Sequence, residues 1–181
     1  MITPQFRSAE SEFHVGWIGA YQSAEDFGAS MDKWVNASGS VSQTYSDTLD
    51  CTHALMASYT VGAPEGPPED GLVWFSRCSL ADDASFADAA ASHAKVTAMM
   101  REMGAKGSSW ILVPGLGSGD AEFDYYQVGA WPSYPVFASA WEIFINGGGM
   151  AKSNALQDGV TRCKSPNVYD AKLILAPPAA D

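Results

Sequence analysis

Positive charge is scarce in this chain. Its 181 residues include 10 Lys and Arg side chains against 21 Asp and Glu, so the net charge at pH 7 is −11. Binding to nucleic-acid phosphates or to anionic membranes needs clustered cations, and this composition opposes both. We therefore expect no nucleic-acid partner and no membrane partner. The acidity favours solubility, and a cationic ligand is the alternative explanation.

Cysteine is also rare, and the three cysteines, Cys51, Cys78 and Cys163, form no CxxC pair. An odd number leaves at least one thiol free, which favours a reduced, cytoplasmic location. The N-terminus lacks the basic-then-apolar pattern of a signal peptide. The alternative is a periplasmic or secreted protein whose signal peptide was removed, with a disulfide between Cys51 and Cys163.

Motifs that would identify a reaction are missing. The longest apolar runs, such as residues 110–113, are far too short to cross a membrane. GLGSGD at 115–120 precedes a strand-like segment, so it does not match a dinucleotide-binding loop. The segment around Ser139 lacks the GxSxG pattern of serine hydrolases, and no histidine spacing matches a metal site. We predict no metal and no cofactor, with haem as the remaining alternative, and the sequence does not decide whether the protein is an enzyme.

The chain does contain an internal repeat. One alignment of the chain with itself pairs five residues near the N-terminus, Gly19, Ala20, Tyr21, Ser23 and Phe27, with Gly129, Ala130, Trp131, Ser133 and Phe137. Each copy has the composition of a strand followed by a turn and an amphipathic helix. We therefore expect residues 13–21 and 123–131 to be equivalent strands.

Periodicity and turn residues predict an α+β protein. Residues 1–12 have the composition of a loose arm, and residues 1–61 as a whole predict an N-terminal βαβ half-repeat. GAPEGPPEDG at 62–71 predicts a linker. Residues 72–175 predict a ferredoxin-like βαββαβ domain, with antiparallel strands and helices on one face, and residues 176–181 a tail.

The element order and the doubled GAY-QS and GAW-PS segments resemble the dimeric α+β barrel superfamily. In that superfamily ferredoxin-like units pack sheet face to sheet face and enclose a barrel, which often holds a small hydrophobic ligand. Its members include cofactor-independent monooxygenases, haem-degrading enzymes and polyketide cyclases, and some use a histidine on a helix. The resemblance implies a homo-oligomer. This chain departs from the family pattern because its first repeat is only half a unit.

Two strands offer candidate ligand-binding residues. Alternation along a strand places Tyr125, Gln127 and Trp131 on one face, and Trp17 and Tyr21 on the equivalent face of the other copy. Small side chains on the opposite faces suit packing beneath helices, so we expect the aromatic faces to be free of helices and to line a barrel. The alternative is that these faces are buried against another sheet for stability alone.

Two further residues are candidates for catalysis. His93 lies on the apolar face of a predicted helix and can serve as a base or ligand, or simply as a hydrogen-bonded core residue. Arg77 interrupts an apolar strand, where it can anchor a ligand carboxylate or pair with Asp124 or Asp170.

The sequence therefore predicts binding, or cofactor-independent conversion of an oxygenase, cyclase or isomerase type, of a small apolar or aromatic ligand. The alternative is a non-catalytic oligomeric scaffold whose sheet faces form subunit interfaces. A cavity behind the aromatic residues favours the first function, whereas a filled interface favours the second.

Overall fold

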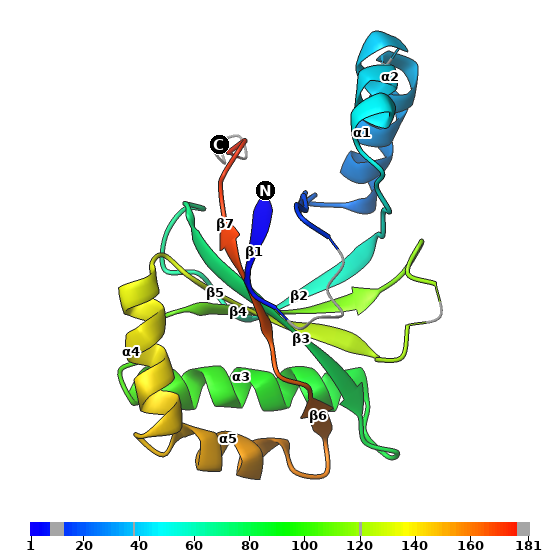
Figure 1. Cartoon of the computed structure of the whole chain (residues 1–181). Helices are drawn as coiled ribbons and strands as arrows, with labels where there is room; N and C mark the ends of the chain where they lie inside the picture. Colours follow the sequence, from blue (N-terminus) through cyan, green and yellow to red (C-terminus); the bar gives the residue numbers. More distant parts are fainter. Residues whose placement is uncertain (8–12, 38, 120, 177–181) are drawn as a thin grey trace. The chain divides into compact units, whose positions relative to one another are not determined.

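The computed structural model describes residues 1–7, 13–37, 39–119 and 121–176 (Figure 1). Within these residues, seven antiparallel strands form one sheet. Its order is β1 (Ile2–Phe6), β7 (Asn167–Ala171), β3 (Gly71–Leu80), β5 (Tyr125–Trp131), β4 (Ser108–Pro114) and β2 (Met56–Gly62), while β6 (Thr161–Cys163) pairs with β3. The predicted α+β class with an antiparallel sheet is confirmed.

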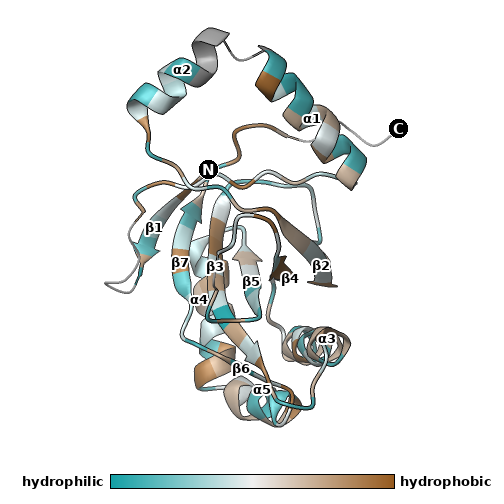
Figure 2. Cartoon of the chain, turned by 90° about the vertical axis from the view of Figure 1, so that its right-hand side faces the viewer, coloured by the Kyte–Doolittle hydropathy of each residue, from teal (hydrophilic) through white to brown (hydrophobic). Residues whose placement is uncertain are grey.

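Three helices lie on one side of this sheet: α3 (Phe86–Glu102), α4 (Tyr134–Ile145) and α5 (Gly149–Gln157) (Figures 1 and 2). A capping box starts α3, because Ser85 accepts from the Asp88 amide and Asp88 accepts from the Ser85 amide. Gly104, just past the end of α3, has a φ of 92°, which suits a residue without a side chain. No helix among the described residues is long and apolar enough to span a membrane.

The chain divides into two compact units, one of residues 1–16 and 54–181 and the other of residues 17–53. The smaller unit contains α1 (Ala24–Ala37) and α2 (Gly39–Thr48). Its aromatic side chains pack on one another: the Tyr45 ring lies 5.8 Å from Trp17 and 6.2 Å from Trp34, and Tyr21 lies 5.4 Å from Phe27.

The predicted βαβ half-repeat is wrong. The expected strand over 13–21 is absent from the described residues, where Gly16 forms only an isolated bridge with Ile2. Residues 2–6, expected to be a loose arm, instead form edge strand β1 against β7. Aromatic content alone does not make a strand, because the backbone also needs a partner, and Trp17 and Tyr21 pack against helix residues.

Strand β3 is apolar on both faces, lies inside the sheet and pairs with β5, β6 and β7. Strands β4 and β5 pair antiparallel as a hairpin. Strand β3 starts at Gly71, which ends the proline-rich connection from β2, and there its backbone lies against Trp131 and Pro132. The last strand, β7, is short and covers Asn167–Ala171.

The sheet has two apolar faces. Cys78, Ile111 and Tyr125 share one face with Ala89 of α3, so this face is covered by helices. Val73, Val128, Tyr169 and Ile2 form a second buried cluster on the other face. The Phe13 ring stacks on Tyr169 at 5.4 Å. Strands β3 and β5 are therefore buried on both sides.

Gly71→Ala should destabilise the protein by at least about 2 kcal/mol, because a Cβ at this position would overlap the Trp131 carbonyl oxygen, which is backbone and cannot rotate away. Gly66→Ala is the matched control: nothing lies within 4 Å of its Cβ position, so we expect a change within about 0.5 kcal/mol. Urea unfolding of both variants tests this, and equal midpoints would contradict the tight approach of β3 to β5.

Candidate functional site

A pocket with a volume of about 120 Å³ lies between the sheet and helices α3 and α4. Trp74 of β3 and Trp131 of β5 form its sheet side, and Phe137 and Trp141 of α4 face them. The ring centroids of Trp74 and Trp131 are 4.7 Å apart, and Phe137 lies 5.0 Å from Trp131. These aromatic rings make the wall of the pocket largely apolar.

Gly129 makes this arrangement of rings possible. It lies directly opposite Trp74 in the β3–β5 register. A Cβ at Gly129 would lie 2.6 Å from the Trp131 ring and 2.7 Å from Trp74 Nε1. The missing side chain therefore leaves the space over the strand to the two indole rings.

Both polar atoms of the Gln127 side chain make hydrogen bonds at the pocket. Its Oε1 accepts from Trp74 Nε1 at 2.9 Å, and its Nε2 donates to Ser109 Oγ at 3.1 Å. These bonds hold the amide and one indole ring in fixed orientations. The pocket is thus built before any ligand enters.

Two other donors at the pocket have no partner. Trp131 Nε1 and Arg101 Nε are buried, and neither makes a hydrogen bond within the described part of the chain. Gly107 lies beside both side chains: Nη2 of the Arg101 guanidinium, not its unpaired Nε, donates to the Gly107 carbonyl at 2.9 Å, and a Cβ on Gly107 would lie 2.7 Å from Trp131 Nε1. Because an unpaired buried donor is costly, this corner of the pocket favours a group that accepts hydrogen bonds.

The pocket is cationic although the protein is acidic. Arg101 and Lys106 line it, and none of the described lining residues is Asp or Glu. A second bond from the Arg101 guanidinium, 2.5 Å to the Ala63 carbonyl, holds this side chain in place. The local charge therefore suits an anionic or strongly polarised acceptor.

The predicted ligand-binding residues are only partly brought together. Gln127 and Trp131 line the pocket, whereas Tyr125 lies farther along the same face. The prediction that this face is free of helices is wrong, since α3 and α4 cover it. Trp17 and Tyr21 belong to the smaller unit and are not in a strand.

Sequence reasoning missed Trp74, Arg101 and Lys106. For Trp74 a signal existed, because alternation along the apolar strand places it on the same face as Leu72, Ser76 and Cys78. The position of Gly129 between Gln127 and Trp131 was a second signal, since a glycine on a bulky face marks a place where other rings approach the backbone.

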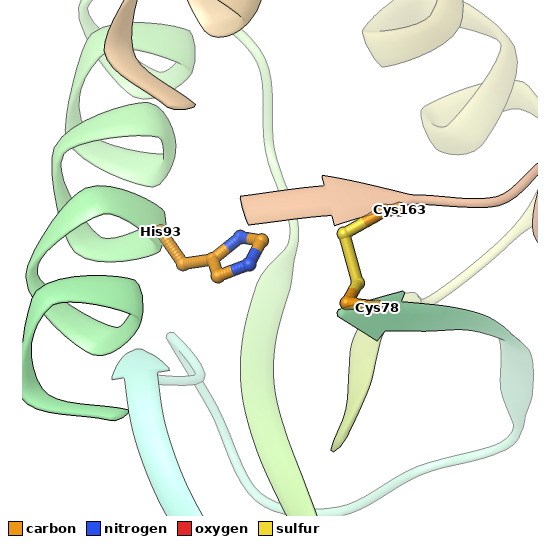
Figure 3. Close-up of side chains that lie close together, drawn as sticks. All are labelled: Cys78, His93 and Cys163. Carbon is orange, nitrogen blue, oxygen red and sulfur yellow. A yellow bond between two sulfur atoms is a disulfide. The ribbon is translucent and has the colours of Figure 1, made fainter. Parts of the chain in front are cut away.

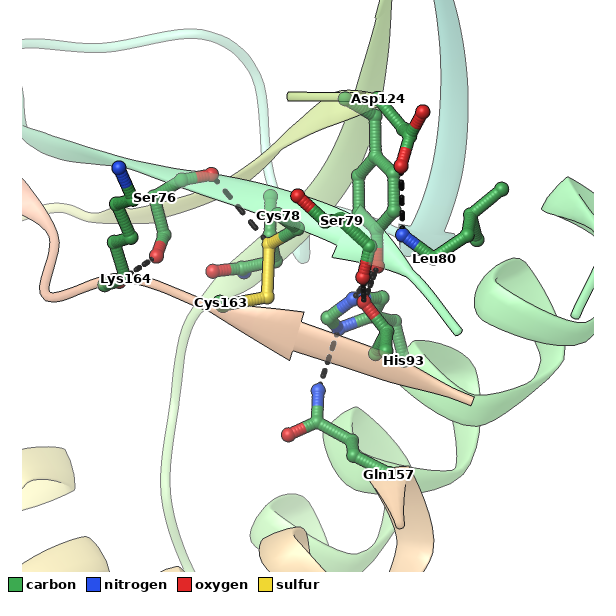
Figure 4. Close-up of a disulfide and its surroundings, with 12 residues drawn as sticks. Ser76, Cys78, Ser79, Leu80, His93, Asp124, Gln157, Cys163 and Lys164 are labelled. Carbon is green, nitrogen blue, oxygen red and sulfur yellow. Dashed lines mark hydrogen bonds between the residues drawn. A yellow bond between two sulfur atoms is a disulfide. The ribbon is translucent and has the colours of Figure 1, made fainter. Parts of the chain in front are cut away.

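His93 is buried in a chain of hydrogen bonds away from the pocket (Figure 4). Its Nδ1 lies 3.2 Å from Gln157 Nε2, and its Nε2 lies 2.9 Å from the Tyr125 hydroxyl. That hydroxyl lies 2.6 Å from Thr161 Oγ1, which donates to the Ser79 carbonyl at 3.1 Å.

One proton assignment satisfies this whole chain. Gln157 donates to Nδ1 of His93, Nε2–H donates to Tyr125, and Tyr125 donates to Thr161. The imidazole is then neutral, in agreement with its environment, because burial lowers the pKa of His93 to about 4. Burial also raises the pKa of the Tyr125 hydroxyl, which therefore keeps its proton.

A disulfide joins Cys78 of β3 to Cys163 of β6, which lie opposite one another in the antiparallel register (Figure 4). The reduced cysteines that the sequence favoured are thus not all found, and the alternative pairing of Cys51 with Cys163 is wrong, because Cys51 is a free thiol in the smaller unit. The internal repeat suggested this pairing by treating its two copies as equivalent. Only the copy over 123–131 forms a strand next to its helix.

Arg77 is exposed and points away from the helices, on the face that carries Phe75 and Tyr126. Its guanidinium carbon lies 5.7 Å from the centroid of the Phe123 ring, and it forms no ion pair among the described residues. The two expected partners are engaged elsewhere: Asp124 accepts from the Leu80 amide, and Asp170 from Tyr134 and Gln5.

No protein-family model, curated protein or solved structure matches this chain. Only the residues of the pocket and of the His93 hydrogen-bond chain therefore indicate a function.

His93→Gln should remove part of the loss of stability in acid. The unfolded histidine takes up a proton near pH 6.5, whereas folded His93 does so only near pH 4. The unfolded state therefore binds more protons between these values, and wild-type stability falls by about 3 kcal/mol from this group as the pH drops from 6.5 to 4.

Urea unfolding across this pH range measures the effect as the difference between wild type and variant. His53→Gln, at an exposed histidine, is the control and should follow the wild-type pH dependence. If His93→Gln follows it as well, the buried neutral imidazole is refuted.

Proposed function

We propose that the protein binds a small single-ring compound that carries an acceptor group, such as a carboxylate or a carbonyl, in the pocket between the sheet and helices α3 and α4. The observation that carries this proposal is the pair of buried donors without partners, Trp131 Nε1 and Arg101 Nε, at one corner of an aromatic pocket. We expect a ligand acceptor at that corner to pair with Trp131 Nε1 beside the Arg101 guanidinium, while the ring packs against the surrounding indoles.

The size of the pocket sets the size of the ligand. Pockets for drug-sized ligands have volumes of roughly 300–1,000 Å³, whereas an apolar cavity of about 150 Å³ admits benzene. At about 120 Å³, this pocket is slightly smaller than that cavity, so it suits at most a single ring. A multi-ring polyketide, which the sequence left open, would require α4 to move.

The proposal is limited to binding. Neither His93 nor Arg77, the candidate catalytic residues, lines the pocket. Arg101 takes the role of ligand anchor that the sequence suggested for Arg77.

We also infer a ferredoxin-like core, supported by the order β7-β3-β5-β4, in which the four strands of the βαββαβ unit are arranged 4-1-3-2. A homo-oligomer formed through the face opposite the helices stays a prediction. The Cys78–Cys163 disulfide favours an oxidising compartment over the cytoplasm as the place where the protein works.

Isothermal titration calorimetry with benzoate and with toluene tests the pocket. Wild type should bind benzoate more tightly than toluene, because only benzoate carries an acceptor for Trp131 Nε1. Trp131→Phe keeps an aromatic ring but removes the N–H, so benzoate affinity should fall about tenfold while toluene affinity changes less than threefold. Trp17→Phe, in the smaller unit, should bind both like wild type.

A second variant tests the location by filling the space. Ala140 is buried and lines the pocket, so Ala140→Leu should abolish binding of both compounds while circular dichroism shows the fold intact. Unchanged binding by Ala140→Leu, or no binding of either compound to wild type at millimolar concentration, would disprove the proposal.

A further inference from the structure

Cys78, Cys163 and His93 form a cluster that is separate from the pocket. Their potential ligand atoms, the two Sγ atoms and a ring nitrogen, all lie within 4.8 Å of one another. It is the one group of three such side chains found in the described part of the chain. Figure 3 shows the imidazole of α3 directed toward the disulfide between β3 and β6.

We propose that this cluster is a redox-gated metal site: the disulfide occupies it under oxidising conditions, and after reduction the two thiolates and His93 bind Zn²⁺. Two thiolates and an imidazole are a ligand set that Zn²⁺ accepts, with water in the fourth position. Cys163 is exposed, so solvent can reach the open side of the site.

The geometry needs only small movements. In a tetrahedral site with Zn–S bonds of about 2.3 Å, the two sulfurs lie about 3.8 Å apart, which reduced sulfurs on paired strands can reach. The ring nitrogen must approach by about 1 Å, because tetrahedral ligands lie roughly 3.6 Å from one another. Strand register already holds both cysteines opposite each other, so the backbone of β3 and β6 can stay in place.

The surroundings of His93 suit a metal ligand. Each ring nitrogen has a partner, Gln157 or Tyr125, so a metal would replace one of these hydrogen bonds while the other is kept. Such an outer bond orients a ligating imidazole and raises its basicity.

The redox step is balanced with an external thiol. Two thiol molecules reduce the disulfide, giving two cysteine thiols and one external disulfide. Zn²⁺ then binds both sulfurs and releases two protons. Either link, covalent or through the metal, holds the short strand β6 against β3, so the fold would keep this connection in an oxidising or a reducing medium.

Cobalt binding to the full chain tests this site. The protein is reduced, freed of reductant without oxygen and titrated with Co²⁺, whose thiolate charge-transfer and tetrahedral d–d bands report the ligands. We expect one Co²⁺ per reduced chain, no bands with the oxidised protein, and loss of the bands when Zn²⁺ is added. Zn²⁺ should also raise the melting temperature of the reduced protein.

Three variants assign the ligands. Cys163→Ser should abolish the charge-transfer band in protein that circular dichroism shows to be folded. His93→Gln should weaken Co²⁺ binding at least tenfold and change the d–d spectrum, and Cys51→Ser should behave like wild type. Equal binding by the oxidised protein or by Cys163→Ser, or loss of binding in Cys51→Ser, would overturn the proposal. These results do not depend on benzoate binding, so the two proposals fail separately.

Discussion

Polar groups buried beneath the helices lose their hydrogen bonds to water and need partners inside the protein. The two ends of this face of the sheet differ in whether such partners are present. At one end Tyr125 is completely buried, and its hydroxyl is part of a hydrogen-bond chain that runs from Gln157 to Ser79. At the other end, Trp131 and Arg101 keep donors without partners. A saturated network stabilises a core, whereas an unsatisfied one marks the place where a ligand can add free energy.

The charges of the protein act at two scales. A net charge of −11 repels anions at long range and slows their approach, especially at low salt. Within the pocket, the nearest charges are those of Arg101 and Lys106. Charges and hydrogen bonds at short range outweigh the long-range repulsion, so an acidic protein can still bind an anionic ligand.

Strand β6 connects the disulfide with the hydrogen-bond chain. Its three residues include both Cys163, which is bonded to Cys78, and Thr161, which bonds to Tyr125 and Ser79. A strand this short has little pairing energy of its own, so the sulfur link also secures the position of Thr161. His93 bonds to Tyr125 in the same hydrogen-bond chain, and its imidazole is neutral because it is buried. The chemistry of the cysteines and the state of the histidine are thus coupled through one short strand.

The sequence by itself determined the local elements of the larger unit. The capping box at Ser85, the glycine after α3, the inner strand β3 and the hairpin of β4 with β5 all follow from residues that are close together in the chain. Which residues share a strand face was also determined, because side chains alternate regardless of what lies above or below them.

Tertiary structure alone decided which of the two faces the helices cover, because both faces of β5 carry side chains that can be buried. It also decided that residues 13–21 form no strand, since pairing requires a partner far away in the chain. The disulfide between Cys78 and Cys163 and the approach of Arg101 and Trp131 to Gly107 have the same origin. These are contacts between distant segments, and local sequence patterns carry no information about which segments meet.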